Sequence, residues 1–351
     1  MWRERVAYPL LDIALTRGLL PDPLLRLGSF VGAELRERRE LRGGVAGQEE
    51  RLQQLLDRMR GGPIAEATDT ANEQHYELPA DFFGLFLGPR RKYSGCLWPA
   101  GVDTLEQAEQ AMLELTCERA QIGDGMRLLD LGCGWGSLSI WLAEHYPACE
   151  VLAVSNSDSQ RRFIESRARD LQLRNLRVVT ADVNGFVPTG TFDRVLSIEM
   201  FEHMRNWHEL LRRVAGWLKP DGRFFMHVFS HRTVPYLFEG TWAAERFFTA
   251  GLMPSHELPL HFQRHLTLEE RWAVPGTHYA STLRAWLERL DDNREQALAV
   301  LAADGRSTRD AQRLLATWRL FLISTAVIWG RDAGNRWLVS HYRFRPALGA
   351  S

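Results

Sequence analysis

The stretch MRLLDLGCGWGS, residues 126–137, joins a run of apolar residues directly to a loop that holds three glycines. Such a pattern is typical of a strand that turns sharply into a helix. The continuation LSIWLAEHY predicts that helix, and CEVLAVS (149–155) predicts a second strand behind it. The order strand, glycine loop, helix, strand indicates an α/β fold.

The same alternation continues beyond the second strand. Apolar runs predict further strands at 176–182, 192–199 and 223–230, separated by helical segments, and RWLVSHYRFRP (336–346) predicts a late strand that returns to the sheet. Alternating strands and helices with short connections indicate a parallel, doubly wound sheet. We therefore expect a Rossmann-like α/β core with an N-terminal helical region and a helical and loop-rich cap inserted late in the sheet.

The pattern also suggests limits for these parts. Residues 72–98 are rich in aromatic and turn residues at irregular spacing, which suits a substrate-facing lid better than a regular element. The expected division is an N-terminal helical region and lid (1–115), a core (116–230), a cap that covers the acceptor (231–315) and a C-terminal return to the sheet (316–351).

Composition narrows the class of protein. The chain has 351 residues, 45% of them hydrophobic, and a formal net charge of −1, so nothing predicts bulk attraction to nucleic acid or to an anionic membrane. Four cysteines form no CxxC pair and no zinc-ligand spacing, which favours a reduced, cytoplasmic protein without a metal site. The short apolar stretches of residues 1–25 are interrupted by charges and predict a helix packed on its own protein rather than on a membrane.

The glycine loop points to a particular cofactor. A dinucleotide fingerprint has the spacing GxGxxG and an acidic residue at the end of the second strand. Here the spacing is GxGxG, Asp130 precedes the loop, and the second strand ends in Ser155 and Asn156. A carboxylate would repel a pyrophosphate but attracts the cationic amino acid part of S-adenosylmethionine.

The expected cofactor is therefore S-adenosylmethionine, held where the strands end. Asp130 would lie beside its methionine part, Asn156 and Gln160 would bond the ribose or the adenine edge, and Asp182 would accept from the adenine amino group. The glycines that let the backbone approach it would be Gly132, Gly134 and Gly136.

A cluster of ionisable residues follows the fourth predicted strand. In SIEMFEHM (197–204), Glu199, Glu202 and His203 stand at i, i+3 and i+4, so the start of a helix here would direct all three to one side. Carboxylates in an apolar setting have a task or a partner. The position at the carboxyl end of a strand favours a catalytic task.

Seven blocks of sequence carry a family resemblance. They are ANEQHYELP, KYSGCLW, AMLELTCERAQ, DLGCGWGSLS, SIEMFEHM, RFFTAGLMPS and HYASTLRAW. In this order they resemble the cyclopropane-fatty-acid synthase superfamily of S-adenosylmethionine-dependent methyltransferases, and within it most closely the coclaurine and pavine N-methyltransferase branch. The resemblance runs from about residue 71 to the C-terminus.

The resemblance implies further roles. It places Tyr93 and Ser94 where family members close over the cofactor. It matches Glu202, His227 and Tyr279 to a pocket that binds bicarbonate in the synthases. The synthases have a glycine at the position of Glu199 and a cysteine at that of Gly95, whereas the N-methyltransferase branch keeps the glutamate.

The acceptor implied in this way is a small amine. His203 would take its proton while Glu199 and Glu202 orient the imidazole or hold the cationic nitrogen. Cap aromatics, among them Phe248, would stack on the acceptor together with the expected substrate-binding residues His227 and Tyr279.

Two alternatives stay open at this point. One is methylation or cyclopropanation of an unsaturated acyl chain in a phospholipid, which alone would involve a membrane. The other is a non-catalytic sensor that binds S-adenosylmethionine, against which the acidic cluster argues. A homodimer is left open, and the sequence does not identify the acceptor.

Overall fold

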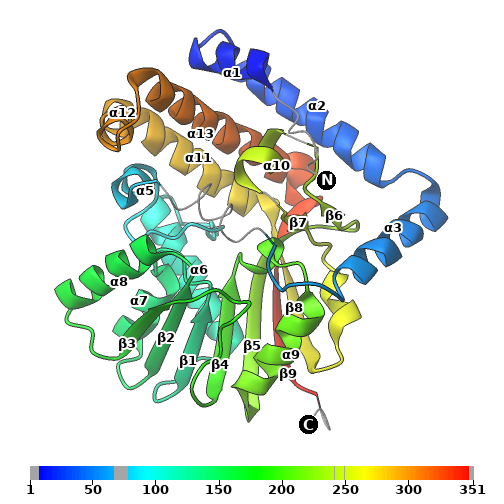
Figure 1. Ribbon diagram of the computed structural model, residues 1–351, viewed down its shortest axis with the longest axis vertical. Coiled ribbons are helices and arrows are strands. Elements are labelled where there is room, and N and C mark those ends of the chain that lie inside the picture. Colours follow the sequence, from blue (N-terminus) through cyan, green and yellow to red (C-terminus); the bar gives the residue numbers. More distant parts are fainter. Residues whose placement is uncertain (1–7, 67–77, 241, 249, 348–351) are drawn as a thin grey trace.

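A seven-stranded sheet forms the centre of the molecule. The computed structural model describes residues 8–66, 78–240, 242–248 and 250–347. In them the strand order is β3-β2-β1-β4-β5-β9-β8, with the first five strands parallel and β9 and β8 antiparallel to their neighbours (Figure 1). Their bounds are β1 Arg127–Leu131, β2 Glu150–Ser155, β3 Leu176–Thr180, β4 Phe192–Ile198, β5 Leu218–His231, β8 Leu266–Pro275 and β9 Trp337–Pro346. The predicted α/β doubly wound fold is confirmed.

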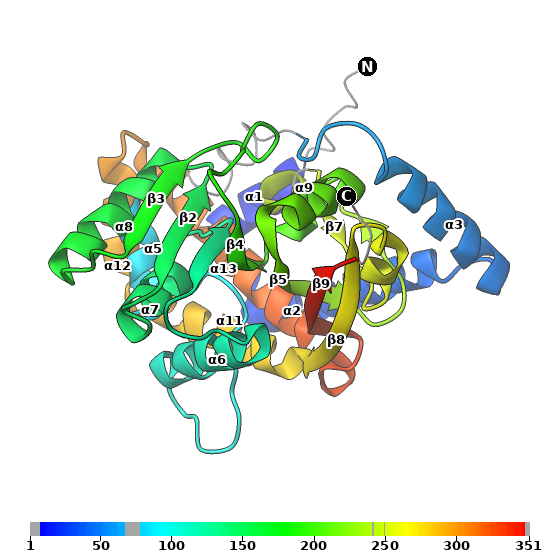
Figure 2. The same ribbon diagram turned by 90° about the horizontal axis from the view of Figure 1, so that it is seen from below.

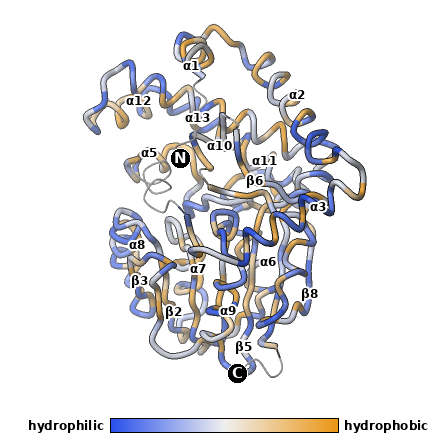
Figure 3. The backbone as a smooth tube through the Cα atoms, turned by 45° about the vertical axis from the view of Figure 1, so that its right-hand side comes forward, coloured by the Kyte–Doolittle hydropathy of each residue, from blue (hydrophilic) through white to orange (hydrophobic). Residues whose placement is uncertain are grey.

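Helices cover both faces of this sheet, which explains why its strands read as continuous apolar runs. In β1, Leu128 packs with Leu113 and Trp141 on one face, while its neighbour Leu129 packs with Leu210 on the other. Figure 2 shows α6 and α9 on these opposite faces. The helices of this part are α6 Leu105–Ala120, α7 Ser137–His145, α8 Asp158–Asp170 and α9 Trp207–Trp217. The edge helix α8 is largely hydrophilic (Figure 3).

The start of α6 follows from its sequence. The Thr104 hydroxyl accepts the Gln107 N–H, and the Gln107 side chain accepts the Thr104 N–H, which together form a capping box. Two of the otherwise unpaired donors at the helix start are satisfied in this way.

A second, helical layer lies beyond the carboxyl ends of the strands (Figure 1). In it α11 packs on α13, and α13 packs on α1 and α2. Its longer helices are α1 Pro9–Thr16, α2 Asp22–Glu40, α3 Gly44–Arg58, α5 Ala80–Phe86, α11 Gly276–Asp292, α12 Arg294–Ala303 and α13 Thr308–Trp329. The short elements are η1 Phe201–His203, β6 Tyr236–Leu237, α10 Trp242–Phe247, β7 Leu252–Met253, η2 Leu258–Phe262 and η3 Arg331–Gly334. None of the helices within the described ranges combines the length and apolar character that a membrane crossing requires.

The structure differs from the expected division at residues 231–315. This range holds β8, an edge strand of the sheet, so it is not cap throughout. Its middle is charged: Glu269 pairs with Arg343 of the adjacent β9 and with Arg223 of β5, the next strand beyond it. Charged residues of this kind are common on edge strands and hide the apolar pattern by which a strand is predicted. The limits expected near 115 and 315 fall inside α6 and α13.

The predicted lid also contains regular structure. Residues 80–86 form α5, and Phe82, Phe83 and Phe86 are fully buried in the helical layer. Aromatic residues at irregular spacing here serve packing. Residues 72–77 of the predicted lid, and most of the block ANEQHYELP, lie outside the described residues.

Candidate active site

The loop after β1 needs its glycines for different reasons. Gly132, Gly134 and Gly136 all have positive φ, at 83°, 53° and 79°. A Cβ on Gly132 would stand 2.8 Å from the sulfur of Met200, and one on Gly136 would stand 2.6 Å from the Ile164 side chain. A Cβ on Gly134 would meet nothing within 4 Å. Two glycines therefore allow tight packing, and the middle one keeps open space beside the loop.

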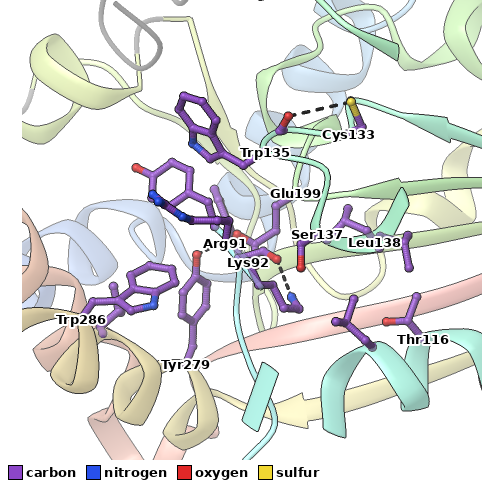
Figure 4. A pocket seen from close by; sticks show the side chains of 18 of the residues that line it. Arg91, Lys92, Thr116, Cys133, Trp135, Ser137, Leu138, Glu199, Tyr279 and Trp286 are labelled. Atoms are coloured by element: carbon purple, nitrogen blue, oxygen red, sulfur yellow. Dashed lines mark hydrogen bonds between the residues drawn. The ribbon is translucent and has the colours of Figure 1, made fainter. Parts of the chain in front are cut away.

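Two adjoining cavities meet at this loop. The first has an aromatic wall and is the one seen in Figure 4; the second lies beside β2 and β3. Both are lined by Gly132, Gly134, Glu199 and His203. The expected residues Tyr93, Ser94, Asp130, Phe248 and Tyr279 line the first cavity, and Asn156, Gln160 and Asp182 line the second.

Asp130 is fixed at the floor of the first cavity. Its side chain is buried, and its Oδ2 accepts the Ser139 hydroxyl at 2.5 Å from the first turns of α7. Burial raises the pKa of Asp130 to about 6. The Ser137 hydroxyl nearby is buried and has no hydrogen-bond partner within the described residues. A buried acid and an unsatisfied hydroxyl fit a cationic, amine-bearing ligand.

The second cavity offers both a hydrogen-bond donor and an acceptor. The Gln160 Oε1 accepts the Ser155 hydroxyl at 2.6 Å, which leaves its buried Nε2 without a partner among the described residues. Asp182 is exposed, and its carboxylate accepts from the Asn184 backbone N–H at 2.8 Å. These donors and acceptors suit the hydroxyl and amino groups of a nucleoside.

Glu199 lies where the two cavities join, and it is held on three sides. Its Oε1 accepts the Gly95 N–H at 2.9 Å and lies 3.3 Å from His227 Nε2, and its Oε2 accepts the Tyr279 hydroxyl at 2.7 Å. Burial raises the pKa of Glu199, and the buried ammonium of Lys92 opposes that rise. The residue has a φ of 48°, which is costly for any residue but glycine.

That φ also corrects the expected geometry of the acidic cluster. Glu199 precedes the short helix η1 in a left-handed conformation, so the three side chains do not project together from one helical face. Glu202 is fully buried, its Oε1 accepts the Phe229 N–H at 2.7 Å, and it is not among the residues that line either cavity. Burial and the nearby Glu199 raise the pKa of Glu202 well above its usual value.

His203 does reach the cavities. Its ring lies nearly parallel to that of Phe248, with 6.0 Å between centroids. Burial lowers the pKa of His203 to about 4, so the imidazole is neutral near pH 7, although Glu199 acts in the opposite direction. A neutral imidazole can accept a proton or a hydrogen bond at its unprotonated nitrogen.

The residues expected to bind substrate separate into two groups. Phe248 and Tyr279 line the first cavity, whereas His227 lies fully buried behind Glu199 and lines neither cavity. Cys96, the neighbour of the position where the synthases have a cysteine, lines neither cavity either. Burial raises the pKa of its thiol to about 12.

Several lining residues were not predicted from the sequence. Lys92 belongs to the block KYSGCLW but was given no role there. The α13 residues Phe321, Thr325 and Trp329 complete the first cavity from a helix assigned to the return of the chain. Only tertiary packing brings α13 to this place, so no local signal could have found them.

The glycine turn follows a buried acid and lies at the switch point of a doubly wound sheet, where such folds bind their ligands. An acid and an imidazole lie at the junction of the two cavities there. This combination defines the class of protein as an S-adenosylmethionine-dependent methyltransferase. Residues 65–329 match the family described as mycolic acid cyclopropane synthetase. The chain belongs to this family.

Individual relatives agree with that assignment. The chain is 37% identical over 338 residues to (S)-coclaurine N-methyltransferase from Thalictrum flavum subsp. glaucum, covering 93% of each chain. It is 32% identical to pavine N-methyltransferase from the same plant, covering 85% of this chain and 86% of the relative. The crystal structure of coclaurine N-methyltransferase bound to N-methylheliamine and SAH is 35% identical, with a TM-score of 0.92 over 96% of this chain and 99% of that one. The predicted superfamily and branch are confirmed.

Proposed function

We propose that this enzyme transfers the methyl group of S-adenosylmethionine to the nitrogen of a small cyclic or aromatic amine. The observation that carries the proposal is Glu199, an acid kept in a strained backbone conformation at the junction of the two cavities. Strain of this kind persists where the surrounding structure enforces it, and it is common at functional sites.

The second cavity and the floor of the first suit the methyl donor. Asn156, Gln160 and Asp182 would hold its adenosine, while Asp130 and the Ser137 hydroxyl would hold its amino acid part. When bound, the donor supplies a methyl group on a positively charged sulfur. The open space at Gly134 lets the backbone lie against it.

The aromatic wall suits the acceptor. Phe229, Phe248 and Trp329 face the first cavity, and the Phe229 ring packs edge-to-face with each of the other two. Aromatic faces attract a cation and stack on a ring system. The wall therefore favours a cyclic or aromatic amine over a small, strongly hydrated one.

The two ionisable residues at the junction would manage the proton. Glu199 is placed to accept a hydrogen bond from the protonated nitrogen and to compensate its charge. His203, neutral near pH 7, would receive the proton that must leave before the nitrogen can attack. Glu202, buried behind them, would support the arrangement through the Phe229 backbone.

The names of the relatives support an amine acceptor over a lipid. Three of them are alkaloid N-methyltransferases that align with most of the chain. A cyclopropane-fatty-acyl-phospholipid synthase from Escherichia coli aligns with 62% of it.

Four free, buried cysteines support a cytoplasmic location.

The test offers labelled S-adenosylmethionine with a panel of cyclic amines and, separately, with phospholipid vesicles, each with and without bicarbonate. Label should enter the amines, and bicarbonate should make no difference. Glu199→Gln should lower kcat at least about 100-fold while S-adenosylhomocysteine still binds. The matched control is Glu257→Gln, an exposed acid outside both cavities, which should act as wild type. Label entering phospholipid alone would overturn the proposal.

A further inference from the structure

Lysine is rare in this chain, and one of its lysines is in the site. Two of the 43 lysine and arginine residues are lysines, Lys92 and Lys219. Lys219 has an ordinary setting: its side chain is 40% exposed and pairs with Asp193 at 2.8 Å. In a chain that uses arginine for nearly every positive charge, a lysine buried in the active site indicates that the compact ammonium matters there.

Lys92 belongs to a strap, residues 90–96, which connects α5 to α6 and lines the first cavity with residues 91–94. It is 3% exposed. Its Nζ donates to the Ser94 hydroxyl at 2.5 Å and to the Gly95 carbonyl at 2.8 Å, and neither acceptor is a carboxylate. A buried ammonium that is not paired directly is costly unless an anion nearby balances it.

The anion on the far side of the strap is Glu199. Lys92 takes the carbonyl of Gly95, while the N–H of the same residue donates to Glu199 Oε1 at 2.9 Å. The backbone at Gly95 is therefore held from both sides. Burial raises the pKa of Glu199 and the Lys92 charge opposes that rise, while burial lowers the pKa of Lys92 and the Glu199 charge opposes that fall.

Other ionisable groups near Lys92 do not replace this partner. Burial raises the pKa of Cys96 to about 12, and burial keeps the pKa values of His227 and His341 well below their usual range, so all three are neutral near pH 7. Burial raises the pKa of Glu109, on α6, to about 7. The two Glu109 oxygens accept the backbone N–H groups of residues 90 and 92 rather than the ammonium.

The cations nearby do not take the place of Lys92. Arg119, on α6, contacts His341 Nδ1 at 2.8 Å, and it is the neighbouring ring, His227, that contacts Glu199. Arg91 is the neighbour of Lys92 in the strap and lines the first cavity, but its guanidinium donates to the Ala80 carbonyl of α5.

We propose that Lys92 is a positioning residue for methyl transfer: from behind the strap its ammonium holds the Gly95 peptide against Glu199 and supplies the charge that keeps this carboxylate ionised. This role rests on the proposed function, in which an ionised Glu199 receives the cationic amine. An arginine would not serve here, because the slot between the Ser94 hydroxyl and the Gly95 carbonyl fits one compact ammonium group.

The two lysines make a direct measurement practicable. Protein labelled with ¹³C at the lysine ε-carbon should show two lysine side-chain resonances, and Lys219→Arg assigns them. In Glu199→Gln the titration midpoint of Lys92 should fall by about one pH unit or more, while that of Lys219 stays where it is. An unchanged Lys92 midpoint in Glu199→Gln would overturn the proposal.

Kinetics provide the second measurement. Lys92→Gln keeps an N–H donor for Gly95 but removes the charge, so the acidic limb of the kcat/KM profile should move up by about one pH unit, with about tenfold loss of rate below it. Lys92→Met should move the limb and also lower the plateau, and Lys219→Met should do neither. If Lys92→Gln lowers the plateau of the kcat/KM profile but leaves its acidic limb at the wild-type pH, Lys92 has a structural role only, and the proposal is overturned.

These two measurements separate the proposals. The resonance titration needs no acceptor, so it also decides the matter if Lys92→Gln fails to fold. If no amine accepts label, the proposed function fails, while the coupling of Lys92 to Glu199 is still tested by the midpoints.

Discussion

The Tyr279 hydroxyl donates to Glu199 Oε2 at 2.7 Å and joins α11 of the helical layer to the end of β4 in the sheet. The same carboxylate accepts the Gly95 N–H with its other oxygen. A sheet strand, a strap and a cap helix thus meet on one acid. Because the carboxylate oxygens are fixed by donors from the protein, their lone pairs toward the cavity have a defined direction.

Removing the Tyr279 hydroxyl should weaken catalysis more than donor binding. A hydrogen bond to a charged group contributes about 1.5–3 kcal/mol, so Tyr279→Phe should lower kcat/KM for the amine about 10- to 100-fold. The dissociation constant of S-adenosylhomocysteine, measured by calorimetry, should stay within a factor of about three of wild type, well below one tenfold step. Tyr146→Phe, a half-buried tyrosine outside both cavities, is the control. Equal kcat/KM values for Tyr279→Phe and wild type would contradict the role given to this contact.

The backbone strain at Glu199 can be measured apart from its charge. Glu199→Gly and Glu199→Ala both remove the carboxylate, but only glycine adopts a φ of 48° without cost. The glycine variant should be more stable than the alanine variant by about 1 kcal/mol in urea unfolding. Both should be inactive toward amines. Equal stabilities would mean that the backbone relaxes and that no strain is held at this position.

Glu109 should give the protein a distinct dependence of stability on pH. Burial raises its pKa to about 7 in the folded state, above the value of an unfolded chain, so ionisation opposes folding. As pH rises from about 4.5 to 7, the wild type should lose stability relative to Glu109→Gln by up to about 1.4 kcal/mol per pH unit. Urea unfolding of both proteins at pH 5 and pH 8 measures the difference. A gap that stays constant between these pH values would show that Glu109 ionises as it does in water.

Much of the fold could be predicted because the sheet is covered on both faces. Burial on both sides requires continuous apolar strands such as RLLDL, and these alternate with helices at intervals that the sequence displays. The strand β8 was not predicted, because it lies at the edge of the sheet, where Glu269 and Glu270 form ion pairs with Arg343 instead of packing in a core. The apolar pattern of a segment reflects how much of it is buried, and an edge strand is buried less than a central one.

The site could be predicted in outline but not in geometry. The glycine spacing and Asp130 pointed to the donor, and both lie at the cavities. The i, i+3, i+4 spacing assumed a helix from Glu199 onward, whereas its positive φ turns this carboxylate to the cavity junction and leaves Glu202 in the core. Lys92 carried no signal beyond its rarity, because its partners Ser94 and Gly95 gain meaning only once Glu199 is seen across the strap.

In the glycine loop, two similar substitutions should affect different properties: one should weaken ligand binding, and the other should lower the stability of the fold. Gly134→Ala meets no protein atom within 4 Å but places a methyl group at a residue that lines both cavities, so it should weaken S-adenosylhomocysteine binding strongly. Its cost in stability should be about 1 kcal/mol, from the positive φ alone. Gly136→Ala would press on the fully buried Ile164 at 2.6 Å and lines neither cavity. It should cost about 2–3 kcal/mol in urea unfolding and bind the ligand nearly as wild type wherever it is folded. If Gly134→Ala binds S-adenosylhomocysteine as tightly as Gly136→Ala does, the donor does not lie against this loop.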